Sequence, residues 1–194
     1  MKESGIEWIG EIPDDWSTRK LNRACFFQEG PGLRTWQFVD FGIKVICVTN
    51  IHDNIIDFSE MCKYISLEEY MSSYTHFTVQ KGDVLLSSSG ASWGKVAIFD
   101  SDETVILNTS TIRLNATASD YLTSGYLRWL LSSDNTSKQL ELLMTGSCQP
   151  NFGPSHLAKI HIPLPSIQIQ SQIASFLDTK CSVIDLTIEK EREL

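Results

Sequence analysis

The chain has 194 residues, of which 42% are hydrophobic, and it carries a formal net charge of −8. This length is sufficient for one compact domain with an appendage, and the composition excludes a disordered or fibrous protein. No apolar stretch approaches the ~20 residues that a transmembrane helix needs, and residues 1–4 lack the apolar region of a signal peptide. We therefore expect a cytoplasmic protein without a membrane partner.

The five cysteines are odd in number, widely spaced and form no Cys-x-x-Cys pair. This pattern predicts reduced, mostly buried thiols rather than a disulfide framework. The four histidines show no metal-ligand spacing, so we expect no structural metal.

Short β-rich runs bounded by turn residues predict strands, and capped stretches with helical periodicity predict helices. Ser66 is followed three residues later by Glu69, which is the capping box of a short helix. The predicted strands are 45–49, with 54–58 as its hairpin partner, 77–79, 84–87, 96–99, 105–107, 111–114 and 160–163. The predicted helices are 66–71, 119–131, 137–144 and 167–194. The fold class is α+β, a mixed α/β globular domain with a central twisted β-sheet, followed by a long C-terminal helix that forms a coiled coil.

The end of the chain predicts a change of architecture. A rigid Leu164-Pro165 ends the compact module, Ser166 stands at a helix N-cap position, and the run that follows contains no Gly or Pro. We therefore expect a domain over residues 1–165 and a helix over residues 166–194, which could reach ~40 Å at ~1.5 Å per residue. An apolar stripe marks one face of this helix and must be buried either against a partner helix or against its own domain. The stripe consists of Ile173, Leu177, Cys181, Ile184 and Ile188.

Four blocks of the sequence resemble the specificity subunits of Type I restriction-modification enzymes, in the order that this family shows. They are residues 4–16 (SGIEWIGEIPDDW), residues 46–51 (ICVTNI), residues 81–98 (KGDVLLSSSGASWGKVAI) and the junction from residue 146 to residue 178. The junction reads GSCQPN, then IHIPLP, then IASFLD. One departure is that Ile169-Gln170 stands where the family usually has Glu-Gln.

This resemblance implies one target recognition domain and one linking helix, which is half of a complete subunit, either natural or truncated. In the family, each recognition domain reads one half of a bipartite site in double-stranded DNA. The linking helix packs antiparallel on a second linking helix, and methyltransferase subunits dock alongside; the restriction subunit joins through them. S-adenosylmethionine, ATP and Mg are used by those partners, so the chain itself needs no cofactor. An isolated half is expected to form a homodimer through its C-terminal helix.

Catalytic motifs are absent or incomplete. Residues 90–95 (GASWGK) are one residue short of a nucleotide-binding phosphate loop and lack the hydroxyl after Lys95. No Asn-Pro-Pro-aromatic motif of an adenine methyltransferase is present, and the acid-x-Lys pair of Asp178 and Lys180 falls on the helical run. The chain is therefore expected to be non-catalytic.

Two polar loops carry side chains suited to DNA. The segment 30–37 pairs a Gly/Pro stretch with side chains that read base edges, and the loop 88–95 combines small donors with one aromatic ring and one cation. For both loops the competing interpretation is structural, with Trp93 packed in the core. Gln149 and Asn151 fall in a block shared by the family, which favours a turn or a backbone contact. The candidate DNA-contacting residues are Arg34, Trp36, Gln37, Lys44, Asn50, Ser89, Ser92, Trp93, Lys95, Gln149 and Asn151.

Net charge leaves a second function open. A module that binds DNA is usually basic, whereas this chain has 16 basic and 24 acidic residues. Phosphate contacts by partner subunits would reconcile the charge with base recognition. The alternative is a protein-interaction module of the same type of complex, without DNA binding of its own.

Overall fold

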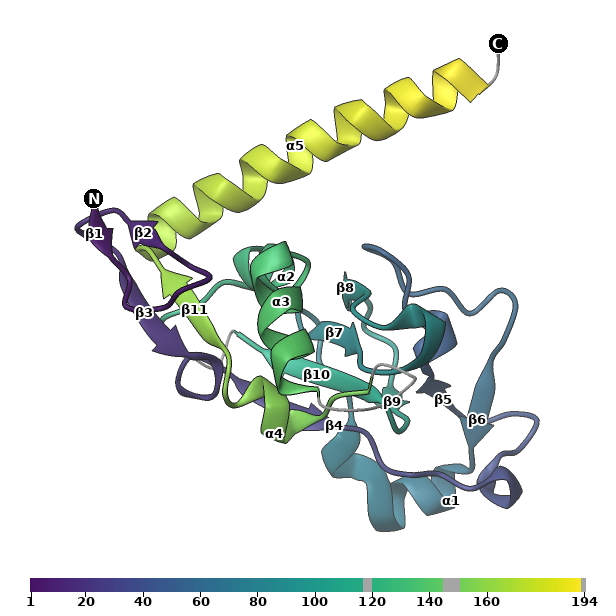
Figure 1. Ribbon diagram of the computed structural model, residues 1–194. Coiled ribbons are helices and arrows are strands. Elements are labelled where there is room, and N and C mark those ends of the chain that lie inside the picture. The colour runs from purple at the N-terminus through teal and green to yellow at the C-terminus, as the bar shows by residue number, and fades with distance from the viewer. Residues whose placement is uncertain (117–119, 145–150, 193–194) are drawn as a thin grey trace.

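The computed structural model describes residues 1–116, 120–144 and 151–192 (Figure 1). The strands are β1 (Lys2–Glu3), β2 (Glu11–Ile12), β3 (Ser17–Lys20), β4 (Phe26–Glu29), β5 (Ile43–Ile46), β6 (Lys63–Ile65), β7 (Val84–Ser87), β8 (Val96–Ile98), β9 (Val105–Leu107), β10 (Thr111–Asn115) and β11 (His161–Leu164). The α-helices are α1 (Leu67–Glu69), α2 (Ser124–Leu131), α3 (Asp134–Leu143), α4 (Pro154–Leu157) and α5 (Ile167–Arg192). Single turns are η1 (Leu21–Arg23), η2 (Thr35–Gln37), η3 (Val48–Asn50), the π-helical η4 (Tyr70–Tyr74), η5 (Thr75–Phe77) and η6 (Gly90–Ser92).

The described strands divide among four sheets, so the expectation of one central sheet was too simple. The largest sheet is antiparallel and has the order β4-β10-β7-β8. A second sheet, β6-β5-β9, pairs β5 and β9 in parallel. β1 pairs with β2. β11, near the C-terminal end of the domain, pairs with β3, near its N-terminal end. β1 and β2 lie at one end of the molecule, and β5, β6 and α1 lie at the other end (Figure 1).

The four-stranded sheet separates two hydrophobic cores. In β7 every residue is buried. Alternate side chains of a strand point to opposite faces of the sheet, so both faces must be covered here. Val84 and Leu86 pack into the core that also contains residues of α2, α3 and α4, whereas Leu85 packs into a second core with residues of β5 and β9. The strands that carry the polar loops described below are therefore held on both faces.

The helix N-cap predicted at Ser66 is confirmed. The Ser66 hydroxyl accepts a hydrogen bond from the Glu69 amide at 3.1 Å, and α1 begins directly after it. α2 is capped by Thr123 and therefore begins later than expected, and the expected start at Ser119 lies outside the described residues.

Two expected strands are wrong. Residues 54–58 form a tight reversal with one isolated bridge, between Ile51 and Ile56, and the partner of β5 is instead β6. The reason is that the Asn50 side chain binds the carbonyl oxygens of Asp57 and Met61, which replaces strand pairing with local bonds. Residues 77–79 likewise contribute only the isolated bridge of Thr78 with Ile106.

Helix α5 has two halves with different surroundings. Its first half packs against α2, and Figure 1 shows its C-terminal half extending beyond the body of the molecule. On the predicted stripe, Ile173 packs against the main core and Leu177 and Cys181 are half-buried. Ile184 and Ile188 are 55% and 44% exposed. The helix therefore both folds onto its own domain and leaves it.

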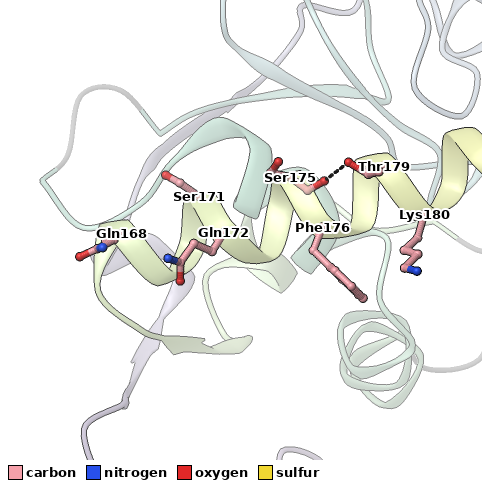
Figure 2. A pocket seen from close by; sticks show the side chains of 7 residues that line it. All are labelled: Gln168, Ser171, Gln172, Ser175, Phe176, Thr179 and Lys180. Carbon is pink, nitrogen blue, oxygen red and sulfur yellow. Dashed lines mark hydrogen bonds between the residues drawn. The ribbon is translucent and has the colours of Figure 1, made fainter.

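The face of α5 that is turned away from α2 carries a shallow hollow of about 700 Å³ (Figure 2). All the residues that line it belong to this one helix, including the exposed Phe176 with the Lys180 ammonium 5.6 Å from its ring centroid. A hollow on a single helix is open surface, so we treat it as part of the exposed face of α5.

Cys25 and Cys47 are buried and Cys62 and Cys181 are half-buried, all as free thiols, while Cys148 lies outside the described residues. Within the described ranges, no cluster of three or more His, Cys, Asp or Glu side chains could hold a metal ion. None of the helices over the same ranges has the length and apolar character needed to cross a membrane.

Candidate nucleic-acid interface

Polar loops from distant parts of the chain converge beside the four-stranded sheet. They are residues 30–34, 47–51, 88–95, 108–110 and 151–153, which we call the loop face. η3 packs against η6, which joins the second loop to the third. The bridge between Ser89 and Asn151 joins the third loop to the last.

Backbone bonds fix the loop 88–95. The amide and the hydroxyl of Ser88 both donate to the Ser110 carbonyl, at 2.9 and 3.0 Å. The Phe152 amide donates to the Ser88 carbonyl at 3.1 Å, and Trp93 packs edge-on against the Phe152 ring with 6.1 Å between centroids. Trp93 is therefore a packing residue of this loop, as the competing interpretation had it.

The turn at residues 108–110 is strained. Ser110 has a φ of 61°, in the left-handed region that residues other than glycine rarely adopt. Its amide donates to a carboxylate oxygen of Glu29 at 3.0 Å, which helps hold this conformation. Backbone strain of this kind concentrates at functional sites.

Gly30 is required by close packing against the same turn. A Cβ atom at Gly30 would come within 2.2 Å of the Asn108 carbonyl oxygen. Only glycine therefore lets the segment 30–34 leave the sheet at this point.

Buried polar atoms without partners gather at this face. Among the described residues, Ser87 Oγ, Trp93 Nε1 and Asn108 Oδ1 are buried and make no hydrogen bond, as is Asp83 Oδ1 elsewhere. Ser87 ends β7, Trp93 lies in the loop 88–95 and Asn108 lies in the turn 108–110, so these atoms belong to the polar interior beneath the loop face.

The cations separate into committed and free groups. Lys44 is held by Glu103 at 2.9 Å, and this hydrogen bond raises the pKa of its ammonium group. Lys95 and Arg34, in contrast, form no ion pair with any residue in the described part of the chain. The charge of Lys44 is thus paired within the chain, whereas Lys95 stands on the loop face with its charge available.

Two candidate residues hold the fold rather than offering groups to a ligand. The Asn50 side chain is 1% exposed: its carbonyl oxygen accepts from the Cys47 amide at 2.9 Å, and its amide group donates to two backbone carbonyls. Gln37 is also buried; it accepts from the Arg34 amide at 2.7 Å and donates to the Tyr74 hydroxyl at 2.9 Å and to Glu69. The side-chain amides of both residues are thus bonded within the protein, to backbone for Asn50 and to backbone and side chains for Gln37, which the sequence did not reveal.

The remaining candidates within the described residues are accessible, but they do not all lie on the loop face. Ser89 and Ser92 are half-buried and Asn151 is exposed, so these three lie with Lys95 on the loop face. Trp36 is 80% exposed and follows Arg34 on a segment that Gln37 anchors near α1. Gln149 lies outside the described residues.

Sequence reasoning missed the turn at residues 108–110. Its signal was a run of four polar residues, Asn-Thr-Ser-Thr, between the two apolar runs that became β9 and β10. The run looks like an ordinary turn until the structure places it against Gly30 and Ser88.

A family model described as the Type I restriction modification DNA specificity domain matches residues 13–194. The chain therefore belongs to this family of DNA-specificity domains, which is not a family of catalytic domains. The resemblance carried by the four sequence blocks is confirmed.

Two curated relatives show the relationship along nearly the whole chain. The MjaVIII specificity subunit of a Type I restriction enzyme from Methanocaldococcus jannaschii is 30% identical over 189 residues, covering 95% of this chain and 44% of the relative. The EcoBI specificity subunit from Escherichia coli is 27% identical over 189 residues, covering 93% and 38%. The chain thus spans less than half the length of these curated relatives.

Solved structures share the fold at lower identity. A chain from work on complex assembly and conformational transition of the type I R-M system has a TM-score of 0.73 at 17% identity, covering 95% of this chain and 43% of that one. The HsdS subunit from Thermoanaerobacter tengcongensis has a TM-score of 0.68 at 16% identity, covering 91% and 40%. The mixed α/β body with a long C-terminal helix is therefore the fold of this family.

Proposed function

We propose that this chain is a DNA target recognition module that reads one half of a bipartite site for a Type I restriction-modification enzyme. Residues 1–165 would recognise DNA through the loop face, and residues 166–194 would connect the module to the rest of the enzyme. The observation that carries the proposal is the convergence of polar loops on one face, together with Lys95, which forms no ion pair among the described residues.

The chemistry of the loop face fits two kinds of contact. Lys95, on the loop that carries the positive-φ glycines Gly90 and Gly94, suits phosphate, which binds without regard to sequence. Ser89, Ser92 and Asn151 offer short donors and acceptors for base edges or for waters that bridge to them. Arg34 and Trp36 stand on the adjoining segment, where a guanidinium could bind a guanine edge in the major groove.

Helix α5 supports the assembly part of the proposal. Its outer half exposes Ile184 and Ile188 on one face, which a second linking helix packed antiparallel would cover as in a coiled coil. In isolation a second copy of this chain would take that place and give a homodimer. Methyltransferase subunits would dock alongside, and the restriction subunit would join through them. S-adenosylmethionine, ATP and Mg²⁺ would serve those partners.

The test is a matched pair of lysine substitutions in the complex with its methyltransferase subunits. Lys95→Ala should weaken binding to all DNA sequences alike and lower the slope of log affinity against log salt concentration by ~0.9 for each phosphate that is no longer neutralised. Lys138→Ala, an exposed lysine on α3, is the control and should leave the slope unchanged. Equal slopes for wild type and Lys95→Ala would remove Lys95 from the interface.

A second candidate is favoured by one observation. Large apolar side chains are exposed around η2 and α1, namely Trp36, Phe41, Leu67 and Met71, on a chain of net charge −8. Such a surface suits a protein partner. Under this alternative the chain assembles the complex without contacting DNA, and wild-type complexes with and without this module would bind DNA with equal affinity.

A further inference from the structure

One buried cation joins three parts of the molecule that are distant in sequence. Arg128, on α2, is 8% exposed. Its guanidinium donates to the Asp178 carboxylate on α5 and to the side-chain carbonyl of Asn54, and it stacks 4.3 Å from the ring centroid of Trp129. The Trp129 indole nitrogen donates to the same Asp178 oxygen at 3.0 Å. The guanidinium thus has two hydrogen-bond acceptors and one stacked ring.

Arg128 is the last of three attachments that follow one another along α5. Gln170 is fully buried; it accepts from the Thr123 amide at 3.0 Å and donates to the carbonyl of Tyr121 at 2.7 Å and to that of Pro165 at 3.0 Å. One turn later Ala174 meets Gly125, where an added Cβ would lie 3.2 Å away. One more turn brings Asp178 to Arg128.

The third attachment differs from the first two in what it reaches. Gln170 and Ala174 contact residues in and just before α2, and Gln170 also contacts Pro165 just before α5. Arg128, in contrast, reaches the turn at Asn54. This turn has a fixed shape, since Asn54 has a φ of 71° and its amide donates to the Val96 carbonyl at 3.0 Å. It follows η3 directly, and η3 belongs to the loop face.

A cleft of about 320 Å³ lies around the same contacts, between α5, α2 and β8, with Arg128, Trp129 and Asp178 in its wall. Beyond this cleft, α5 has only exposed positions. Among the described residues, Asp178 is therefore the last residue of α5 whose side chain bonds to the body of the molecule. The guanidinium is planar and binds two acceptors in fixed directions, which a lysine could not do.

We propose that Arg128 is a positioning residue for DNA recognition: it ties α5 to the Asn54 turn, so that the direction of the helix and the position of the neighbouring loop face are set together. The role in DNA recognition rests on the proposed function, whereas the coupling between α5 and the Asn54 turn exists without DNA. Coupling between two sites is reciprocal, so a change at Asp178 must be felt at Asn54 and a change at Asn54 must be felt on α5.

Hydrogen exchange of the whole chain, without DNA, tests the coupling. Asp178→Asn should accelerate amide exchange in residues 51–57 by about tenfold or more, because Arg128 loses its charged partner and no longer holds the Asn54 turn. Asn54→Gly should accelerate exchange in α5 beyond residue 178; glycine tolerates the positive φ, so the turn can keep its shape while it loses the side chain that binds Arg128. Asp178→Glu keeps a carboxylate and should restore most of the protection.

Asp185→Asn is the matched control, because Asp185 lines the same cleft and forms no ion pair among the described residues. It should leave both segments at wild-type rates. Exchange in β7 and β10 should stay unchanged in all variants, which separates local coupling from global unfolding.

The second arm measures DNA affinity of the complex with methyltransferase subunits. Asp178→Asn should weaken binding to the cognate site about tenfold, although Asp178 is not on the loop face, and Asp185→Asn should not. Wild-type exchange rates at residues 51–57 in Asp178→Asn, or faster exchange with unchanged affinity, would overturn the proposal. Absence of DNA binding by the wild-type complex would contradict the proposed function, while the exchange rates would still decide the coupling.

Discussion

The loop face and the junction between α2 and α5 treat their polar groups in opposite ways. On the loop face, Lys95 has no counter-ion among the described residues, and the side chains of Ser89, Ser92 and Asn151 are partly or fully accessible. At the junction, Gln170 makes three hydrogen bonds and Arg128 has two acceptors and a stacked ring. Polar networks that are satisfied make a structure rigid, whereas a lysine without a counter-ion remains available to bind phosphate. The junction is therefore a fixed support, whereas the loop face is the surface at which we propose that DNA binds.

The strongest effect is expected from breaking the support. Gln170→Ala should lower the free energy of unfolding by roughly 3 kcal/mol, because it leaves the Thr123 amide and two backbone carbonyls without their partner. The measurement is urea denaturation followed by circular dichroism. Gln172→Ala, an exposed glutamine on the same helix, should change stability by no more than about 0.5 kcal/mol. Equal losses for both variants would show that the junction does not hold the helix.

The outer half of α5 should govern association instead of stability. Replacing Ile184 and Ile188 with Glu should raise the dissociation constant of a homodimer about a hundredfold or more and give a monomer by light scattering, with the fold intact. Each substitution places a charge on an apolar contact surface that a second helix would bury. Thr179→Glu lies on the opposite face of the helix and should leave the dimer intact. A wild-type chain that is monomeric at high concentration would contradict the exposed-stripe account.

The side of the core beneath the junction should weaken in alkali. Burial raises the pKa of the Cys25 thiol from 9.0 to about 12, and burial also raises the pKa of the Tyr126 phenol. Above pH 9 the unfolded chain loses the Cys25 proton while the folded chain keeps it. The stability that depends on the protonated thiol is therefore complete below pH 9 and is lost as pH rises toward 12.

Urea denaturation at several pH values between 9 and 12 measures this loss. In Cys25→Ala the free energy of unfolding should fall less steeply, by up to about 1.4 kcal/mol per pH unit. Cys62→Ala is the control for loss of a half-buried thiol. The same slope in wild type and Cys25→Ala would show that the thiol is accessible to solvent in the folded state.

The sequence predicted the parts of the fold that local chemistry decides. The Ser66 cap and the start of α5 just after Ser166 follow from a few neighbouring residues, and both were correct. The prediction of a strand over residues 54–58 was wrong because the Asn50 side chain binds backbone carbonyls of this region. These bonds reach as far as Met61, 11 residues along the chain. Long-range pairings of this kind leave no periodic pattern in the sequence.

The candidate site was predicted in part for the same reason. Serines, a tryptophan and a lysine between two apolar runs indicated the loop 88–95, but they did not reveal that residues 108–110 and 151–153 join it. Gln37 and Asn50 carried the right chemistry for DNA and were placed by the fold in structural roles. Arg128 gave no signal, because its partners lie 74 residues before it and 50 residues after it.

The central claim is that the loop face contacts DNA, and photo-crosslinking tests it most directly. A photoreactive amino acid such as benzoylphenylalanine at Ser92, in the complex with methyltransferase subunits, should form a covalent adduct with bound duplex DNA on irradiation. The same group at Ser137, an equally half-buried serine on α3, should form none. Crosslinks from Ser92 alone are the predicted result. Crosslinks from Ser137 but not from Ser92 would place the DNA on another surface and contradict the account.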